Sequence, residues 1–518
     1  MAGESYPDFT TGAVRERLRE AHRELCSCYL GKTFPHILVG KEYYSSLPLY
    51  ADANPYSGNA LGQFQRFDPA WDIGSAIGDI DKAQDIWRET PWKVRAEYLY
   101  ALAHALMSEK WTWRFVSALM HDTGKSAAEA WGEYNEVYRF VLIHIWFMFK
   151  RYTENDQFKS CGLSGDYFGY SFKGRGIGLV VAPFNFPAAI PVRMLTLMLA
   201  FGNVVILKGA TTVLSDPRLK IVSFTGSSEV CEAMIKKHQF SPRTGGNQLT
   251  IGSAETGGVN WVVLRYFHDL DWFVSQCIKG NFGISGQKCS TTRLVFVPEE
   301  LKKELLERLF AVYDKLIYGN VLDGADLGPV IDMVAKKEID RKIAFLAEGF
   351  AKVVYQKKIT LSPSGQDVAP TILLADYDAI RNKVVMQTLL DTEIFGPVFT
   401  VVPFRSIDEV HALRPSMEYG LTGSYYAEHP ERLAEGMMFL PAGNAYGNRR
   451  STGATGPEEF GGLGGSKSSY NSGLKGYDEV ALYVQKRTHS AVYPKSWTER
   501  EKLTFRRKME LHGVAVKW

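Results

Sequence analysis

The sequence predicts an α/β protein built on doubly wound parallel sheets. From residue 166 onward, short apolar runs alternate with segments of helical periodicity, and a second alternating series follows Cys289. This alternation is typical of parallel strands with helices on both faces of a sheet. The first 150 residues differ, because their pattern is mostly helical.

In this N-terminal part, four segments show the apolar spacing that helices require. They are 11–28, 79–89, 93–111 and 126–152. Acidic residues open the segment 79–89, as helix N-termini prefer. The aromatic residues of 126–152 recur at helical spacing, so we expect them in the core.

The first alternating series begins with a predicted strand pair, 167–172 and 177–182, joined by a Lys-Gly-Arg-Gly turn. The elements expected after it are strands at 204–207, 221–225, 247–251 and 261–265, and helices from Ser227 and over 270–282. Prolines and polar residues break the stretch 187–207 into a helix and a strand, so we do not interpret it as a membrane span.

The second series predicts an independent sheet after Cys289. Its expected elements are a strand at 292–298, a helix over 298–316, and strands at 399–404, 423–427 and 443–448. Residues 451–476 are rich in glycine and serine, which indicates a functional or mobile loop rather than a linker.

The composition excludes several classes of protein. The 518 residues carry a net charge of +3 with dispersed basic residues, so we expect no nucleic-acid binding. None of the six cysteines forms a CxxC pair, so no metal site is expected and a reduced, intracellular setting is favoured. We also expect no secretory signal and no transmembrane segment.

Three residues together point to acyl-transfer chemistry. Cys289 stands in "GISGQKCSTT", whose small residues would let backbone amides approach a reacting atom. Glu255 precedes a Gly-Gly turn and could act as a general base, and Asn185 follows a strand in "APFNFP" and could donate to an oxyanion. A lone cysteine is more often a buried small hydrophobe. If the site is assembled, Cys289 should be the most reactive of the thiols.

The chain resembles the aldehyde dehydrogenase superfamily from about residue 12 to 490. The matching blocks, in order, are "APFNFP", "GNVVILK", "FTGSSEV", "ETGGVN", "GQKCS" and "EIFGPV". "GISGQKCS", "GPVID" and the tail from "FGGLGGSKSS" are most similar to the Δ1-pyrroline-5-carboxylate dehydrogenase branch. That branch oxidises glutamate γ-semialdehyde to glutamate with NAD in proline breakdown.

The resemblance implies a role for each matched residue. Cys289 would attack the aldehyde, Asn185 and the Cys289 backbone N–H would stabilise the oxyanion, and Glu255 would activate water. The residues implied for NAD are Lys208 at the adenine ribose, Gly226 and Ser227 at the pyrophosphate, and Glu393 and Phe395 at the nicotinamide. Those implied for the carboxylate end of the substrate are Ser290, Gly465 and Ser466. Taken singly, each of these residues would favour a structural role, whereas matched in order within the family blocks they favour the functional one.

Several positions depart from the family pattern. Val259 and Trp261 replace a lysine and a proline, and Cys231 replaces a glycine and would crowd a helix close to the cofactor. The loop 465–467 reads Gly-Ser-Lys where the branch has Ser-Gly. The basic C-terminal tail runs past the end of the family pattern and is either a docking arm or a solvated helix.

The largest departure lies between two predicted strands, 204–207 and 221–225. The family places a helix, a strand and most of a second helix there, whereas this chain has only 209–220, with a proline at 217. We expect the two strands to be neighbours joined by a loop crossover. Because the adenine wall would then be missing, we predict that NAD binds weakly or not at all.

The fold implied is aldehyde-dehydrogenase-like, with a truncated cofactor domain. It comprises a dinucleotide-binding domain over 1–156 and 177–268, a catalytic domain over 269–478, and an oligomerisation arm with a tail over 157–176 and 479–518. The partners implied are a small aldehyde substrate and further subunits, in a homo-oligomer or a larger complex. The mitochondrial matrix is implied by resemblance, with the cytoplasm as the alternative. A catalytically silent structural subunit is the alternative function.

Overall fold

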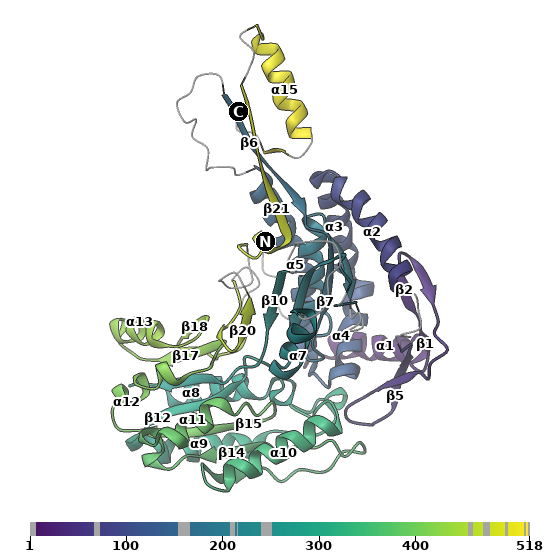
Figure 1. Cartoon of the computed structure of the whole chain (residues 1–518). Helices are drawn as coiled ribbons and strands as arrows, with labels where there is room; N and C mark the ends of the chain where they lie inside the picture. Colours follow the sequence, from purple (N-terminus) through teal and green to yellow (C-terminus); the bar gives the residue numbers. More distant parts are fainter. Residues whose placement is uncertain are drawn as a thin grey trace.

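Two large, mostly parallel sheets form the body of the protein (Figure 1). The computed structural model describes residues 7–66, 73–153, 166–207, 213–214, 216–239, 251–453, 459–469, 477–492, 496–511 and 514–515. One sheet has five strands and the other has seven, which confirms the doubly wound α/β prediction.

The five-stranded sheet has the order β20-β10-β9-β7-β8. Its strands are β7 (Ile177–Val181), β8 (Val204–Leu207), β9 (Leu219–Thr225), β10 (Ile251–Glu255) and the antiparallel β20 (Lys467–Ser469). Helix α6 (Ala189–Ala200) joins β7 to β8, and α7 (Ser228–Gln239) follows β9. Residues 247–250 of the predicted strand 247–251 lie outside the described residues.

The two strands around the short crossover are not neighbours, which corrects our expectation. β7 lies between them and pairs in parallel with both β8 and β9. Within the described part of the chain, β8 is therefore the edge of the sheet. Val213 and Leu214 of the crossover are buried, and they pack with Ile77 and Ile80 of α2 (Ile73–Glu89) against one face of the sheet. Two apolar side chains of the crossover thus pack with α2 on this face of the sheet.

The seven-stranded sheet has the order β13-β14-β15-β12-β11-β17-β18. Its strands are β11 (Asn260–Leu264), β12 (Thr292–Pro298), β13 (Lys352–Gln356), β14 (Thr371–Leu374), β15 (Val398–Phe404), β17 (Thr422–Tyr426) and β18 (Asn444–Gly447). The predicted range of the dinucleotide-binding domain ran to residue 268, but β11 pairs with β12 and β17 in this second sheet.

Helices cover both faces of the seven-stranded sheet. Trp261 and Val263 of β11 face one core with α10 (Met333–Ala347), α11 (Lys383–Asp391) and α13 (Pro430–Phe439). Val262 and Leu264 face the other core with α8 (Leu270–Asn281) and α9 (Lys302–Lys315). Alternate residues of a strand point to opposite faces, so this central strand is apolar throughout.

The N-terminal part is helical, as expected, with α1 (Gly12–Cys28), α2, α3 (Trp92–Leu106), α4 (Glu109–Thr123) and α5 (Ala127–Thr153). The predicted helix 93–111 is in fact two helices, because α3 ends at Leu106 with Met107 as its C-cap, and Ser108 is the N-cap of α4. The short strands β1 (Thr33–Phe34), β2 (His36–Leu38), β3 (Lys41–Tyr43), β4 (Tyr50–Ala53) and β5 (Ala60–Phe64) were not predicted.

A three-stranded sheet with the order β21-β6-β22 projects away from the body, at the top of Figure 1. β6 (Asp166–Gly174) pairs with β21 (Val484–Val492) and β22 (Val514–Ala515), and α15 (Glu499–Leu511) lies beside them. The predicted pairing of 167–172 with 177–182 is therefore wrong, since β7 belongs to the five-stranded sheet. Among the described residues, no helix combines the length and apolar character that crossing a membrane demands.

Candidate active site

The structure brings the predicted catalytic residues together between the two large sheets. Asn185 lies on the loop after β7, and Glu255 is the last residue of β10, so both stand at the carboxyl edge of the five-stranded sheet. Cys289 lies on the loop before β12 of the other sheet. The Asn185 Nδ2 donates to the carbonyl oxygen of Gln287 at 2.8 Å, which ties its loop to the cysteine loop.

The loop that carries Cys289 has an unusual backbone. Ile284, Ser285 and Gly286 all have positive φ values, of 47°, 52° and 75°. This conformation is costly for a β-branched residue and is often found at functional sites. A Cβ on Gly286 would lie 2.0 Å from the Gly396 carbonyl oxygen, so only glycine fits at this position.

Two buried side chains hold this loop in place. The Arg293 guanidinium donates to the carbonyl oxygens of Gly286 and Gly396, both at 2.9 Å. The Asn260 amide donates to the carbonyl oxygens of Cys289 at 2.6 Å and Thr291 at 2.8 Å. The nucleophile loop is thus connected both to β11 and to the segment that contains Glu393 and Phe395.

The Cys289 thiol is neutral at rest. Burial and, to a smaller extent, the charges of Glu393 and Glu255 raise its pKa to about 12, although the N–H groups of Ser290 and Cys289 oppose this shift. A neutral thiol reacts slowly with alkylating reagents. This argues against the expectation that Cys289 is the most reactive thiol of the resting protein, since Cys26 and Cys28 are exposed.

Replacing Glu393 with glutamine should therefore make Cys289 more reactive. Removing this carboxylate lowers the thiol pKa, and a fall of one unit gives about tenfold more thiolate at pH 8. Alkylation of the peptide containing Cys289, followed by mass spectrometry, measures the rate. Buried Cys277 is the control and should stay unlabelled in both proteins. Slower labelling of Cys289 in the variant would contradict this electrostatic account.

The side chains of Asn185 and Glu255 are both buried, and each makes a hydrogen bond to a backbone group. One amide hydrogen of Asn185 is used by Gln287, and the described residues offer no second hydrogen-bond partner to this amide. The other hydrogen can therefore point to an oxyanion. The Glu255 carboxylate is buried, and its Oε2 accepts from the Gly462 N–H at 3.1 Å.

The residues implied for NAD are only partly placed. The Glu393 Oε1 accepts from the Gly258 N–H at 3.1 Å, and the ring of Phe395 meets Phe184 edge to face at 6.2 Å. Gly226 donates to the Glu255 carbonyl oxygen at 3.1 Å, and Ser227 precedes α7. Lys208 lies outside the described residues.

Cys231, which we expected to crowd a helix close to the cofactor, lies on α7. Its side chain is buried, and it packs with Phe224 of β9 and Ala254 of β10. It therefore faces the sheet beneath α7.

The residues implied for the substrate carboxylate have mainly structural contacts. The Ser466 side chain is fully buried, and its Oγ accepts from the Gly420 N–H at 3.1 Å. The N–H of Gly465 donates to the Glu418 carbonyl oxygen. The carbonyl oxygen of Ser290 accepts from the Ser451 hydroxyl at 3.0 Å. Their role in recognising a carboxylate stays a prediction.

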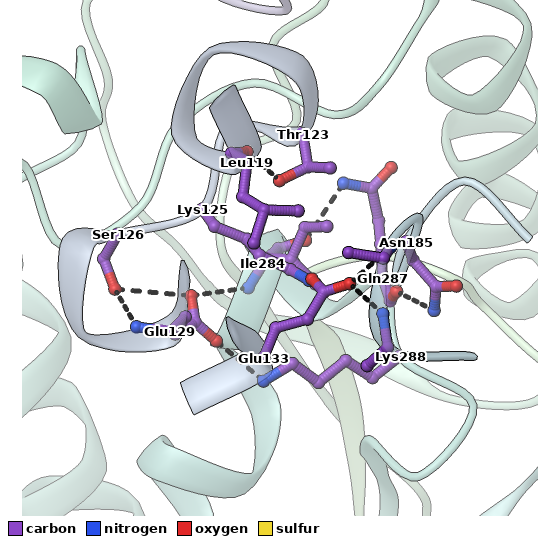
Figure 2. A network of polar contacts seen from close by, with 12 residues as sticks. Leu119, Thr123, Lys125, Ser126, Glu129, Glu133, Asn185, Ile284, Gln287 and Lys288 are labelled. Carbon is purple, nitrogen blue, oxygen red and sulfur yellow. Dashed lines mark hydrogen bonds and ion pairs between the residues drawn. The ribbon is translucent and has the colours of Figure 1, made fainter. Parts of the chain in front are cut away.

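Sequence reasoning missed a charged network on α5, shown in Figure 2. The Glu129 carboxylate accepts from the Lys288 ammonium at 2.7 Å and from the Ile284 N–H at 3.0 Å. Glu133, one helical turn further along, pairs with Lys125. The spacing of the two glutamates on one helix face, opposite a lysine next to Cys289, was the available signal.

A third carboxyl on α5 predicts a pH effect. Burial and the nearby Glu133 carboxylate raise the pKa of half-buried Glu136 to about 7. Because the pKa of Glu136 is higher in the folded state than in the unfolded state, the contribution of this side chain to stability is complete at low pH. That contribution is lost as the pH rises through 7. Glu136→Gln should match the native protein near pH 4 and exceed it by about 2 kcal/mol at pH 8.

Urea unfolding at pH 4 and pH 8 measures this difference. Glu97→Gln, at an exposed position on α3, is the matched control and should show no pH-dependent gain. Equal effects of Glu136→Gln at both pH values would disprove the assignment.

Comparison with known proteins agrees with this geometry. The model of the aldehyde dehydrogenase family matches residues 45–215 and 210–486, two segments that meet inside the short crossover. The 1-pyrroline-5-carboxylate dehydrogenase of Bacillus cytotoxicus is 26% identical over 94% of this chain and 98% of its own length.

Solved structures are similar over most of the chain. The 1-pyrroline-5-carboxylate dehydrogenase from Thermus with bound NAD has a TM-score of 0.84 at 23% identity, over 95% of this chain and 99% of that chain. Proline utilization A from Bdellovibrio bacteriovorus has a TM-score of 0.86 at 25% identity, over 96% of this chain and 54% of that chain. With the family model matched along most of its length, the chain belongs to the aldehyde dehydrogenase family.

Proposed function

We propose that this protein oxidises glutamate γ-semialdehyde to glutamate with NAD as acceptor, in proline breakdown. The observation that carries the proposal is the convergence of Cys289, Asn185 and Glu255, which are a nucleophile, an oxyanion donor and a base. The full-length relatives named for this activity support the choice of substrate.

The chain's own residues account for the acyl-transfer steps. Cys289 Sγ attacks the aldehyde carbon after losing its proton to a nearby carboxylate, and both Glu393 and Glu255 are close enough to influence the thiol. The free amide hydrogen of Asn185 and the Cys289 N–H stabilise the oxyanion. Bound NAD would supply the hydride acceptor. Glu255 then activates the water that hydrolyses the thioester, releasing the acid and the free thiol.

We propose that NAD fits this site at one end only. Glu393 and Phe395 lie beside the nucleophile loop, where the nicotinamide is implied. At the adenosine end, β8 is the edge strand of the described sheet, and Val213 and Leu214 pack against α2. No described strand lies beyond β8 to enclose the adenosine half of NAD, and this supports weak NAD binding.

Steady-state oxidation at high NAD concentration tests the function. We expect kcat/KM for glutamate γ-semialdehyde to exceed that for a neutral aldehyde of similar length by about tenfold or more, as charge recognition would require. A preference for long alkyl aldehydes would contradict the proposal, and Lys467 is then the first residue to examine.

One observation, the short crossover, favours the alternative of a silent structural subunit, and the assembled catalytic residues oppose it. Absence of oxidation with saturating NAD would support that alternative. We also propose a homo-oligomer or a larger complex, because the arm strands β6 and β21 project from the body. The relatives named above are bacterial, so they give no support to the mitochondrial matrix.

A further inference from the structure

Helix α6 begins without a capping side chain of its own. Its N-cap is Ala188, whose side chain has no oxygen to accept from the first turn. The first N–H groups of a helix need acceptors, particularly when they are buried. Pro191 has no N–H, so the N–H groups of Ala188, Ala189 and Ile190 are the ones that need acceptors.

Glu133 of α5 supplies the missing acceptor. Its Oε1 accepts from the Ala188 N–H at 2.9 Å and from the Ala189 N–H at 3.1 Å. The carboxylate is fully buried, and its Oε2 pairs with Lys125, whose side chain is 1% exposed. Figure 2 shows Glu133 and Lys125 beside the Asn185 loop.

Lys125 contacts the same loop from another direction. Its ammonium lies 3.9 Å from the ring centroid of Phe186, the residue after Asn185. The loop is therefore held by Glu133 at Ala188, by Lys125 at Phe186, and by Gln287 at the Asn185 amide.

We propose that Glu133, paired with Lys125, is the positioning residue that aligns the Asn185 amide with the oxyanion. The inference rests on the acyl-transfer function proposed above. Glu133 touches neither Cys289 nor the reacting atoms by any described contact, so it acts through α6 and the loop. An error of about 1 Å in such an arrangement can cost on the order of a hundredfold in rate.

Three variants distinguish the effect of losing the helix cap from the effect of losing the buried ion pair. Lys125→Met/Glu133→Gln removes both charges and keeps an acceptor for the two N–H groups. Lys125→Met/Glu133→Leu removes the acceptor as well. Glu133→Asp keeps a charge opposite Lys125, but its side chain is too short to keep both hydrogen bonds to α6. It takes the place of the leucine variant in the comparison if that variant fails to fold.

Hydrolysis of p-nitrophenyl acetate is the activity to measure, because it needs neither NAD nor the semialdehyde. We expect kcat to fall about 10- to 100-fold in the leucine and aspartate variants, with KM changed less than about threefold. The glutamine variant should recover most of kcat. Equal kcat in the leucine and glutamine variants would overturn the proposal.

Combination with Asn185→Ala shows whether Glu133 acts through the amide. On that background, Glu133→Asp should have no further effect on kcat. The same loss with and without Asn185 would show a general structural role and refute the positioning.

Hydrogen exchange over residues 184–192 gives a readout independent of activity. Glu133→Asp should speed exchange of the Ala188 and Ala189 amides by about tenfold or more, since their acceptor is lost. Unchanged exchange overturns the proposal. If the native protein hydrolyses no ester, the proposed function fails, while exchange still decides whether Glu133 holds the loop.

Discussion

Replacing Glu255 with glutamine is expected to trap an acyl group on Cys289. The variant keeps the nucleophile and the Asn185 amide, and it removes a negative charge that raises the thiol pKa. Acylation should therefore continue. Deacylation needs a base to activate water, and loss of that base slows such a step by about 10²- to 10⁴-fold.

Mass spectrometry after incubation with p-nitrophenyl acetate measures the trapped species. The peptide containing Cys289 should carry one acetyl group in Glu255→Gln and little in the native protein. Cys289→Ala is the control and should carry none. If Glu255→Gln turned over ester at the native rate without an adduct, another group would be the base.

The sheets could be predicted because their strands are nearly continuous apolar runs. β12 matches the predicted 292–298, and β8 matches 204–207. The pairing of β6 was mispredicted, because the Lys-Gly-Arg-Gly turn has the local chemistry of a hairpin. Its true partner, β21, lies more than 300 residues further along the chain, and no local pattern reports such a contact.

The break between α3 and α4 was missed for a related reason. Met107 and Ser108 separate the two helices, and no glycine or proline marks the place in sequence. The short strands before residue 66 were missed because their burial does not alternate clearly.

Cys289, Glu255 and Asn185 were predicted from residue type and family blocks, and the structure brings them together, while their catalytic roles stay predictions. Glu133 was not found, because its partners are backbone N–H groups 55 and 56 residues away. Every residue except proline has a backbone N–H, so residue type does not indicate which N–H groups a side chain will accept from. Lys125 and Glu133 also look like an ordinary exposed pair until burial is known.

Membership of the family allows the effect of the short crossover on NAD affinity to be stated relative to another member. We expect this protein to bind NAD about a hundredfold or more weakly than the Bacillus cytotoxicus relative, a difference of about 2.8 kcal/mol. Dinucleotide folds hold the adenosine half between the helix that follows one strand and the next strand. In the described part of this chain no strand lies beyond β8, and Val213 and Leu214 are buried against α2.

Calorimetric titration of both proteins with NAD and with nicotinamide mononucleotide tests this expectation. The mononucleotide lacks adenosine, so it should bind the two proteins with similar affinity through the Glu393 and Phe395 end. The weaker affinity of this protein relative to the Bacillus cytotoxicus protein should then appear only with NAD, because only NAD carries the adenosine half that is expected at the shortened side of the sheet. Micromolar NAD binding to this protein would show that the crossover or a partner subunit completes the pocket, and the prediction would be wrong.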